Sequence, residues 1–357
     1  MNKLYLQYCL TCLVVFFCLV TNTVSGQDAQ LSQYYAAPLY LNPALVGTPG
    51  DGRANINYRN QWVGVPSNYM TFIGGFDTPL ANRHLSVGGQ IQQDIMAQKS
   101  GAVVDRLVFN ATGGYKVKVS KDYTLSFGLQ IGFEQSSLGF YKLLFGDQID
   151  DDGQTGNPTQ DRVDRESNIY PDFSAGTLFY GKDMWFGLSV YHINQPSITK
   201  FNQGTDYLPL RFSLQAGYRI PLTYRWHGSV ANFDDKFVSF MMHYQSQGKQ
   251  DQLSTGVNLD YHPIVFGVWY RGLILKDNED PSTFNHDAIV IMSGVKLKKL
   301  LLGYSFDMPI GGLRMSEGNS HEISLRYQFN FYPNYRKKKK KSNNSNGPTD
   351  KCPTPSL

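Results

Sequence analysis

The chain has 357 residues, of which 17% are charged and 14% are aromatic. Water-soluble proteins have about 25% charged residues, so much of this chain is expected to face something other than water. The mean hydropathy is nevertheless -0.34, and beyond residue 25 no apolar run approaches the roughly 20 residues of a membrane-spanning helix, which excludes a helical membrane protein. The formal net charge of +4 comes from a basic C-terminus, so the body of the chain is close to neutral and is not expected to bind nucleic acid.

Residues 1–26 are predicted to be a secretory signal peptide. Lys3 supplies the positive start, residues 10–20 form the apolar stretch, and small residues lead to a cleavage site between Gly26 and Gln27. A retained anchor helix is the alternative. Because the other cysteines lie in this segment, the mature chain is expected to keep only Cys352, with no disulfide within the chain and no cysteine metal site.

Residues 27–52 are rich in Tyr, Pro and Asn, and from residue 53 to residue 335 polar and apolar side chains alternate in stretches of about eight to ten residues. In the clearest stretch, Leu125, Phe127 and Leu129 point one way, and the residues between them are polar or small. This period of two is typical of strands with two different faces. Fourteen such stretches are expected, at residues 53–59, 69–76, 85–92, 106–117, 123–135, 173–180, 184–193, 211–220, 236–245, 253–261, 265–271, 288–297, 300–307 and 322–329.

The connections between these stretches alternate between short and long. Short turns at residues 120–122, 181–183, 262–264 and 298–299 alternate with longer connections such as 136–172 and 194–210, and the exceptions are 221–235 and 246–252. Outer-membrane barrels have short periplasmic turns and long external loops, and an even number of strands returns the chain to the periplasm. Closure removes the sheet edges, which lipid could not hydrogen-bond. We therefore predict an all-β, transmembrane, antiparallel up-and-down β-barrel of about 14 strands in the outer membrane, with both termini in the periplasm.

Residues 336–357 begin with a basic run, Arg336 to Lys341, followed by Asn, Ser, Gly and Pro. This composition cannot bury apolar surface and predicts a disordered periplasmic tail. Contact with anionic lipid headgroups and binding of a partner are both open for it.

Short motifs follow one another in a fixed order along nearly the whole mature chain. They are Leu31-Ser32-Gln33-Tyr34, Leu41-Asn42-Pro43-Ala44 with Gly47, Arg59-Asn60-Gln61-Trp62, Asp77-Thr78-Pro79, Gly187-Leu188-Ser189, Gly267-Val268-Trp269-Tyr270-Arg271, Gly303-Tyr304-Ser305-Phe306-Asp307 and His321-Glu322-Ile323-Ser324-Leu325. With these motifs the chain resembles the PorP/SprF family of outer-membrane proteins, which is associated with the type IX secretion system and gliding motility of Bacteroidetes.

The resemblance implies a non-enzymatic barrel that is needed to secrete, or to retain at the cell surface, a cargo protein with a C-terminal sorting domain, often an adhesin. It also implies contacts with the periplasmic ring or outer-membrane subunits of the secretion machinery, and with membrane lipid. It brings no catalytic residues and no cofactor. The basic tail is the main departure from the family pattern.

Residues 27–52 contain the first motifs and are predicted to be a periplasmic, plug-like segment before the first strand. Their candidate residues are Ser32, Gln33, Tyr34, Asn42, Pro43, Ala44 and Gly47. Two interpretations are open: a plug that closes the periplasmic mouth of the barrel, and a docking site for the periplasmic machinery.

Several charged residues occupy positions that alternation turns toward the lumen. The predicted lumen network consists of Arg59, Asp94, Arg271, Asp307 and Glu322. Structural ion pairs and a role in gating or cargo contact are the two interpretations. The longest loop contains Asp147, Asp150, Asp151 and Asp152, a possible partner loop that lacks the ligand spacing of a calcium loop; a solvated loop and divalent-cation binding are the alternatives.

An enzyme is not predicted. The seven histidines are scattered and the sequence has neither a G-x-S-x-G nor an H-E-x-x-H motif, so no catalytic, metal or cofactor site is expected. The alternative to a secretion component is an outer-membrane channel or a transporter of small hydrophobic molecules. A transporter would have an open lumen, whereas an anchor would be plugged.

Overall fold

The computed structural model describes residues 28–80, 84–96, 103–139, 149–150, 153–154, 166–198, 207–222, 236–248, 250–272, 286–312, 314–329 and 352. Strands dominate these ranges. The helices among them are short, and none has the length and apolar character needed to cross a membrane.

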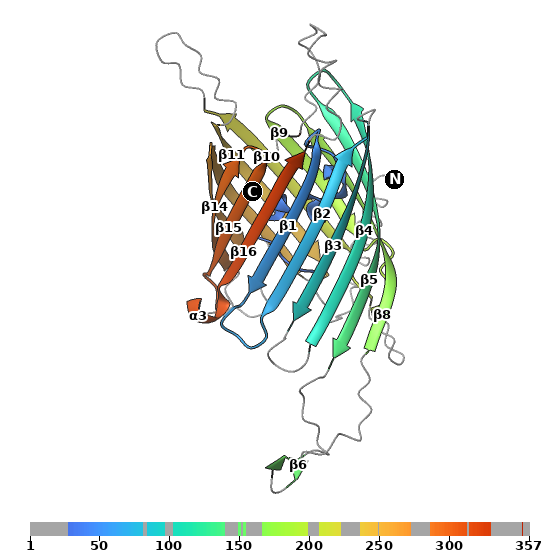
Figure 1. Cartoon of the computed structure of the whole chain (residues 1–357), viewed down its shortest axis with the longest axis vertical. Coiled ribbons are helices and arrows are strands. Elements are labelled where there is room, and N and C mark those ends of the chain that lie inside the picture. Colours follow the sequence, from blue (N-terminus) through green and yellow to red (C-terminus); the bar gives the residue numbers. More distant parts are fainter. Residues whose placement is uncertain are drawn as a thin grey trace, which may run out of the picture.

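Fourteen of the strands in the described ranges close into one antiparallel barrel (Figure 1). Neighbours along the chain pair with each other, and β1 pairs with β16 from Gly52↔Phe329 to Gln61↔Ser320, which closes the ring. The strands are β1 (Gly52–Gln61), β2 (Tyr69–Pro79), β3 (Leu85–Met96), β4 (Val103–Lys118), β5 (Thr124–Gly139), β8 (Glu166–Tyr180), β9 (Met184–Tyr191), β10 (Arg211–Pro221), β11 (Lys236–Gln247), β12 (Gln250–Tyr261), β13 (Ile264–Gly272), β14 (His286–Leu297), β15 (Leu300–Pro309) and β16 (Ser320–Phe329). A separate pair, β6 (Ile149–Asp150) and β7 (Gly153–Gln154), lies outside the barrel.

The prediction of an all-β, up-and-down barrel with fourteen strands is confirmed. Two strands extend well beyond the predicted stretches: β5 continues to Gly139 and β8 begins at Glu166, with pairing up to Leu138↔Glu166. On β5, backbone hydrogen bonds prolong the hairpin past the end of the apolar alternation. On β8 the alternation itself continues, since Ile169 is exposed and Tyr170 is buried. Residues 223–235, in one of the two exceptional connections, lie outside the described ranges.

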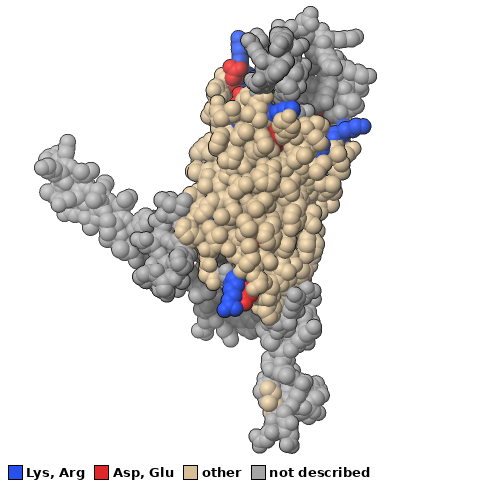
Figure 2. All heavy atoms as spheres, turned by 90° about the vertical axis from the view of Figure 1, so that its left-hand side faces the viewer, with Lys and Arg blue, Asp and Glu red and all other residues tan. Residues whose placement is uncertain are grey.

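The outer wall of the barrel is apolar because every second side chain points outward. On β5, Phe127, Leu129 and Ile131 are exposed, whereas Ser126 and Gln130 are buried inside. Figure 2 shows a wide belt of uncharged residues on one face of the barrel, with charged groups at its two ends. Such a belt suits contact with lipid hydrocarbon.

The two ends of the barrel differ in their connections. One end, which we call the short-turn end, carries the turns at residues 119–123, 181–183, 262–263 and 298–299. The opposite end, the long-loop end, carries the connections from β5 to β8 and from β9 to β10, and the one-turn helix α3 (Met315–Gly318) lies there between β15 and β16.

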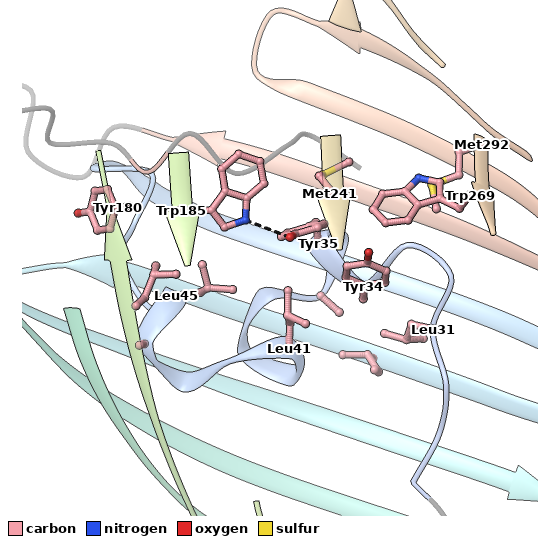
Figure 3. Packing of buried hydrophobic residues seen from close by; sticks show 14 of the residues in the cluster. Leu31, Tyr34, Tyr35, Leu41, Leu45, Tyr180, Trp185, Met241, Trp269 and Met292 are labelled. Carbon is pink, nitrogen blue, oxygen red and sulfur yellow. Dashed lines mark hydrogen bonds between the residues drawn. The ribbon is translucent and has the colours of Figure 1, made fainter. Parts of the chain in front are cut away.

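Residues 28–51, which we call the inner segment, lie inside the barrel. They form the short helices η1 (Tyr34–Ala36), α2 (Pro38–Leu41) and η2 (Pro43–Leu45), and nearly all of their side chains are buried. The hydrophobic core of the protein therefore lies between the inner segment and the inner wall, where Leu41 and Leu45 pack with Trp185 and Trp269 (Figure 3).

Candidate functional site

The inner segment is attached to the long-loop end of the barrel through the carboxylate of Asp28. Its oxygens lie 2.8 Å from Nη1 of Arg106, 2.8 Å from Nη1 of Arg211 and 2.8 Å from Nε2 of His192. The backbone N–H of Asp28 donates to Oε1 of Gln247 at 3.0 Å. One buried carboxylate thus joins three cationic side chains, two from strands β4 and β10 and one from the residue that follows β9.

The partners of Asp28 are themselves held by further carboxylates. Arg106 Nη2 donates to Oε2 of Glu134 at 2.7 Å, and the hydroxyl of Tyr170 donates to the same carboxylate. Asp94 lies 3.8 Å from Arg106. We call Asp28, Arg106, Glu134, His192 and Arg211 the Asp28 cluster; such pairing is what makes buried charges tolerable.

His192 lies just past the end of β9 and contacts two carboxylates, Asp28 at 2.8 Å and Asp172 at 3.0 Å. Burial alone would lower the pKa of His192, but these carboxylates raise it to about 9. The pKa of Asp28 stays well below its usual value, because His192, Arg211 and Arg106 outweigh its burial. The ring is therefore protonated, and this end of the segment is ionic, at neutral pH.

A pH dependence of stability follows from the raised pKa of His192. The histidine is expected to stabilise the fold fully below about pH 6.5, its unfolded pKa, and to lose that contribution as the pH rises through about 9. The stability advantage of the wild type over His192→Gln should therefore shrink between pH 6 and about pH 10. Urea unfolding in detergent at several pH values measures it, and an advantage that is independent of pH would contradict the assignment.

Next along the inner segment, Ser32 lies at the centre of a second buried network. Its hydroxyl donates to Asp307 at 2.7 Å and accepts from Nη1 of Arg59 at 2.8 Å and from Nη1 of Arg271 at 3.0 Å. Arg59 and Arg271 also pair with Asp307, at 2.7 and 3.0 Å. The Ser32 hydroxyl thus uses its donor and both of its acceptor sites.

Glu322 on β16 completes this network by binding the backbone of the inner segment. Its carboxylate accepts the backbone N–H groups of Ser32 at 2.7 Å and of Gln33 at 3.2 Å, and it lies 3.4 Å from Arg59. We call Ser32, Arg59, Arg271, Asp307 and Glu322 the Ser32 cluster. It joins β1, β13, β15 and β16 to the inner segment across the seam where the barrel closes.

Replacement of Ser32 with alanine is expected to lower the free energy of unfolding by about 1–3 kcal/mol, because buried donors and acceptors lose a partner. The control is Ser316→Ala in α3, where the side chain is exposed and the change should stay within about 0.5 kcal/mol. Unfolding in urea, followed by the shift in gel mobility between folded and unfolded barrel, measures both. Equal effects of the two substitutions would show that the Ser32 network contributes nothing.

The middle of the inner segment packs against glycines of the barrel wall. The Asn42 side chain donates to the backbone carbonyls of Thr177 at 3.1 Å and of Leu188 at 3.2 Å, and its Oδ1 accepts the N–H of Ala44 at 2.8 Å. Gly128, Gly176 and Gly187, which we call the glycine row, face this stretch. A Cβ at Gly128 would lie 2.2 Å from the carbonyl carbon of Pro43, and one at Gly176 would lie 2.0 Å from Oδ1 of Asn42.

At the short-turn end the inner segment turns into β1 through Gly47. Its N–H donates to Oδ2 of Asp77 at 2.6 Å, and its carbonyl accepts from Nζ of Lys116. Asp77 also binds Arg53 at 2.8 Å. The φ of Gly47 is +64°, and an added Cβ would lie 2.3 Å from Oγ of Ser86, so both conformation and space favour glycine here.

Aromatic contacts link the inner segment to β9, β11 and β13. Nε1 of Trp185 donates to the hydroxyl of Tyr35 at 3.0 Å (Figure 3). Tyr34 meets Trp269 edge-on, with the ring centres 5.2 Å apart, and lies 4.6 Å from the ring of His243. Cys352, from the predicted tail, packs against the same core, and its N–H donates to the carbonyl of Thr48 at 3.2 Å.

Most of the predicted candidate residues meet in this site. Ser32 and Gln33 contact the predicted lumen residues Arg59, Arg271, Asp307 and Glu322, and the remaining motif residues Tyr34, Asn42, Pro43, Ala44 and Gly47 all lie in the inner segment. Asp94 does not join that network, because its register partner on β4 is Arg106, which belongs to the Asp28 cluster.

The sequence reasoning missed Asp28, Arg106, Arg211 and the glycine row as site residues. Alternation places Arg106 and the glycines on the inner face, and a glycine inside a strand signals close approach of another backbone. That signal could have identified the glycine row. Nothing in the local sequence around Asp28 indicates its three partners.

The structure does not describe all of the predicted site residues. Gly26, Gln27, Asp147, Asp151 and Asp152 lie outside the described residues, and of Asp150 only the backbone in β6 is described. Among the residues that are described, no group of three or more His, Cys, Asp and Glu side chains could hold a metal ion.

The inner segment crosses the whole lumen, since Asp28 contacts the long-loop end and Gly47 contacts the short-turn end. The sequence predicted a segment at the periplasmic mouth and both termini in the periplasm. If the short-turn end faces the periplasm, however, Asp28 lies at the external mouth. The difference arises because the segment folds back through the barrel and does not rest at the mouth from which β1 begins.

The motifs that build this site are spread over most of the barrel sequence. The match to a family model covers the same part of the chain. A family model described as "Type IX secretion system membrane protein PorP/SprF" matches residues 23–327. The chain belongs to the PorP/SprF family. The Ser32 cluster of this PorP/SprF protein therefore unites, in one network, motifs that are far apart in the matched sequence.

Among solved structures, this PorP/SprF protein is similar in fold to several barrels. The Ralstonia pickettii toluene transporter TbuX is 11% identical, with 82% of this chain and 94% of that chain covered and a TM-score of 0.47. BamA from Haemophilus ducreyi is 11% identical, with 78% and 70% covered and a TM-score of 0.39. A mutant porin of Rh. blastica is 7% identical, with 78% and 99% covered and a TM-score of 0.33. No curated protein matches the chain.

Proposed function

We propose that this PorP/SprF-family protein is a non-enzymatic barrel of the outer membrane, closed by its inner segment, that secretes a cargo protein or anchors it at the cell surface. The cargo, an adhesin-like protein, binds through its C-terminal sorting domain at the long-loop end, which faces outward. Periplasmic ring or outer-membrane subunits of the type IX secretion machinery are the other partners. The apolar wall contacts membrane lipid, and nucleic acid is not a partner.

The observation that carries this proposal is the filled lumen. The inner segment buries Tyr34, Tyr35, Leu39 and Leu45 against the wall. Ion pairs of Asp28 and hydrogen bonds of Ser32 fix it to several strands of the ring. A barrel that is filled in this way is expected to block the passage of solutes. It offers a rigid platform whose connections at one end are long enough to bind a protein.

The same burial favours the plug over the docking site for residues 28–46. A docking segment must present side chains to its partner, whereas Ser32, Gln33 and Asn42 point into networks with the barrel wall. A variant that lacks residues 28–46 should therefore lose barrel stability. A stable truncated barrel that no longer co-purifies with ring subunits would favour the docking site.

The function is tested by deleting the gene and comparing the proteins at the cell surface before and after complementation. Loss of one or a few surface proteins that carry a C-terminal sorting domain, restored by the wild-type gene, is the expected result. In planar bilayers the purified protein should be silent. An unchanged cell surface together with steady conductance, or with impaired uptake of a small hydrophobic molecule, would establish the channel or transporter instead.

A further inference from the structure

The outer wall carries an apolar groove of about 690 Å³ that runs across β9, β10, β11 and β12. Its sides are large outward side chains, among them Phe186, Tyr218, Phe240 and Met242, which are all strongly exposed. Pockets of roughly 300–1,000 Å³ hold one small-molecule-sized ligand. The groove is therefore of the size of a lipid chain, and it is too small for a transmembrane helix about 10–12 Å across.

The groove exists because small residues interrupt the outer wall between these large side chains. Ala216 stands between Phe186 and Met242 in the register of the sheet, so a pit opens between two large neighbours. Next to it, Gly217 carries no side chain. Residue 217 faces the lumen, where an added Cβ would lie 2.1 Å from Cζ2 of Trp185, so the indole packs against the inner side of β10 at this point.

Trp185 lines the groove although it points into the barrel. Its side chain is only 1% exposed, and residue 185 belongs to the groove lining because β9 runs along the groove floor. The backbone of β10 at Gly217 separates the indole from the membrane side. A molecule in the groove would lie across the Gly217 backbone from the indole of Trp185, within the short range of a fluorescence quencher. Lipids that merely coat the outer wall would lie farther from the indole.

Lys236 lies on the same outward face of β11 as the groove residues Phe240 and Met242. Outward positions alternate from Lys236 through Val238 and Phe240 to Met242, and a strand rises about 3.3 Å per residue, so Lys236 lies roughly 13 Å from Phe240 toward the short-turn end. Its Nζ lies 3.9 Å from the centre of the Tyr261 ring. Lys and Tyr are typical of the level where lipid headgroups meet hydrocarbon.

We propose that this groove binds one acyl chain of a phospholipid from the leaflet at the short-turn end, with the phosphate of that lipid at Lys236. Apolar, flexible chains match an apolar pit in the bilayer-facing wall, and the ammonium of Lys236 matches the negative headgroup. The site is separate from the inner segment and from the proposed cargo surface.

The test uses bromine atoms in the acyl chain, which quench tryptophan fluorescence at short range. The full-length protein is reconstituted in vesicles of phosphatidylglycerol with chains brominated near their middle, and the quenching due to Trp185 is the difference between wild type and Trp185→Phe. The wild type should show clear quenching of Trp185. Ala216→Phe, which fills the pit from outside, should lose most of it, and the control Val87→Phe on the outer face of β3 should keep it.

The headgroup is tested with Lys236→Gln. Quenching of Trp185 should be stronger in brominated phosphatidylglycerol than in brominated phosphatidylcholine, and Lys236→Gln should remove this preference. Equal quenching of Trp185 in wild type and Ala216→Phe, or no quenching in either lipid, would overturn the proposal. If Ala216→Phe does not fold, Ala216→Leu replaces it, and native mass spectrometry should find one phospholipid retained by the wild type and lost by the variant.

Discussion

Arg59→Met is expected to lower the free energy of unfolding by about 3–5 kcal/mol, the typical effect of breaking a buried ion pair by removing one partner. Arg59 is fully buried and lies between Asp307 at 2.7 Å and Glu322 at 3.4 Å. Methionine fills a similar volume, so the loss reports on charge and hydrogen bonding more than on a cavity. Urea unfolding in detergent micelles, followed by gel mobility, measures the effect.

Arg219→Met is the matched control. Arg219 lies 3.7 Å from Asp183 at the short-turn end, with 26% of its side chain exposed, and partly exposed pairs contribute about 0–1 kcal/mol. The double variant Arg59→Met with Glu322→Gln should recover part of the loss, because it removes the carboxylate that Arg59 neutralised. Similar losses for Arg59→Met and Arg219→Met would contradict a special role of the Ser32 cluster.

Gly128→Ala is expected to loosen the inner segment. The new Cβ would lie 2.2 Å from the carbonyl carbon of Pro43 and 2.4 Å from the backbone nitrogen of Ala44. Backbone atoms cannot turn aside as a side chain can, so the segment must shift, and overpacking of this kind costs about 1–3 kcal/mol. A lower temperature of unfolding and the appearance of ion conductance in planar bilayers are the expected readouts.

Gly113→Ala serves as the control for this substitution. It changes the same residue type on the neighbouring strand β4, but nothing lies within 4 Å of its added Cβ. Its stability should stay close to that of the wild type, and the protein should remain silent in bilayers. If both variants behave alike, the glycine row does not hold the inner segment.

The fold could be predicted from the sequence because strands in a membrane barrel repeat one simple pattern. Alternation over stretches such as residues 123–135 fixed which side chains point inward, and closure followed from the lack of hydrogen-bond partners in lipid. Alternation also placed Arg59, Asp307 and Glu322 on the inner face. The end of β5 was missed because pairing continues through Ser136 and Ser137 without alternation.

The contents of the lumen could not be predicted in the same way. Alternation shows that a residue faces inward but not which inward residues meet, so Asp94 was grouped with Arg59 although its register partner is Arg106. The inner segment has no periodicity, because its short helices fit the space that the wall leaves open. Its path, and with it the position of Asp28 at the long-loop end, depends on contacts between residues more than 70 positions apart, such as Asp28 with Arg106.

The route of the inner segment constrains the order of assembly. Asp28 is bound at one mouth while β1 starts at the other, and the ring is sealed by β1 and β16. A segment that passes through a closed barrel either inserts after the barrel has closed or is enclosed while the strands pair. Enclosure avoids moving the charged Asp28 through a lumen that side chains already fill. We therefore expect the inner segment to be in place before β1 pairs with β16.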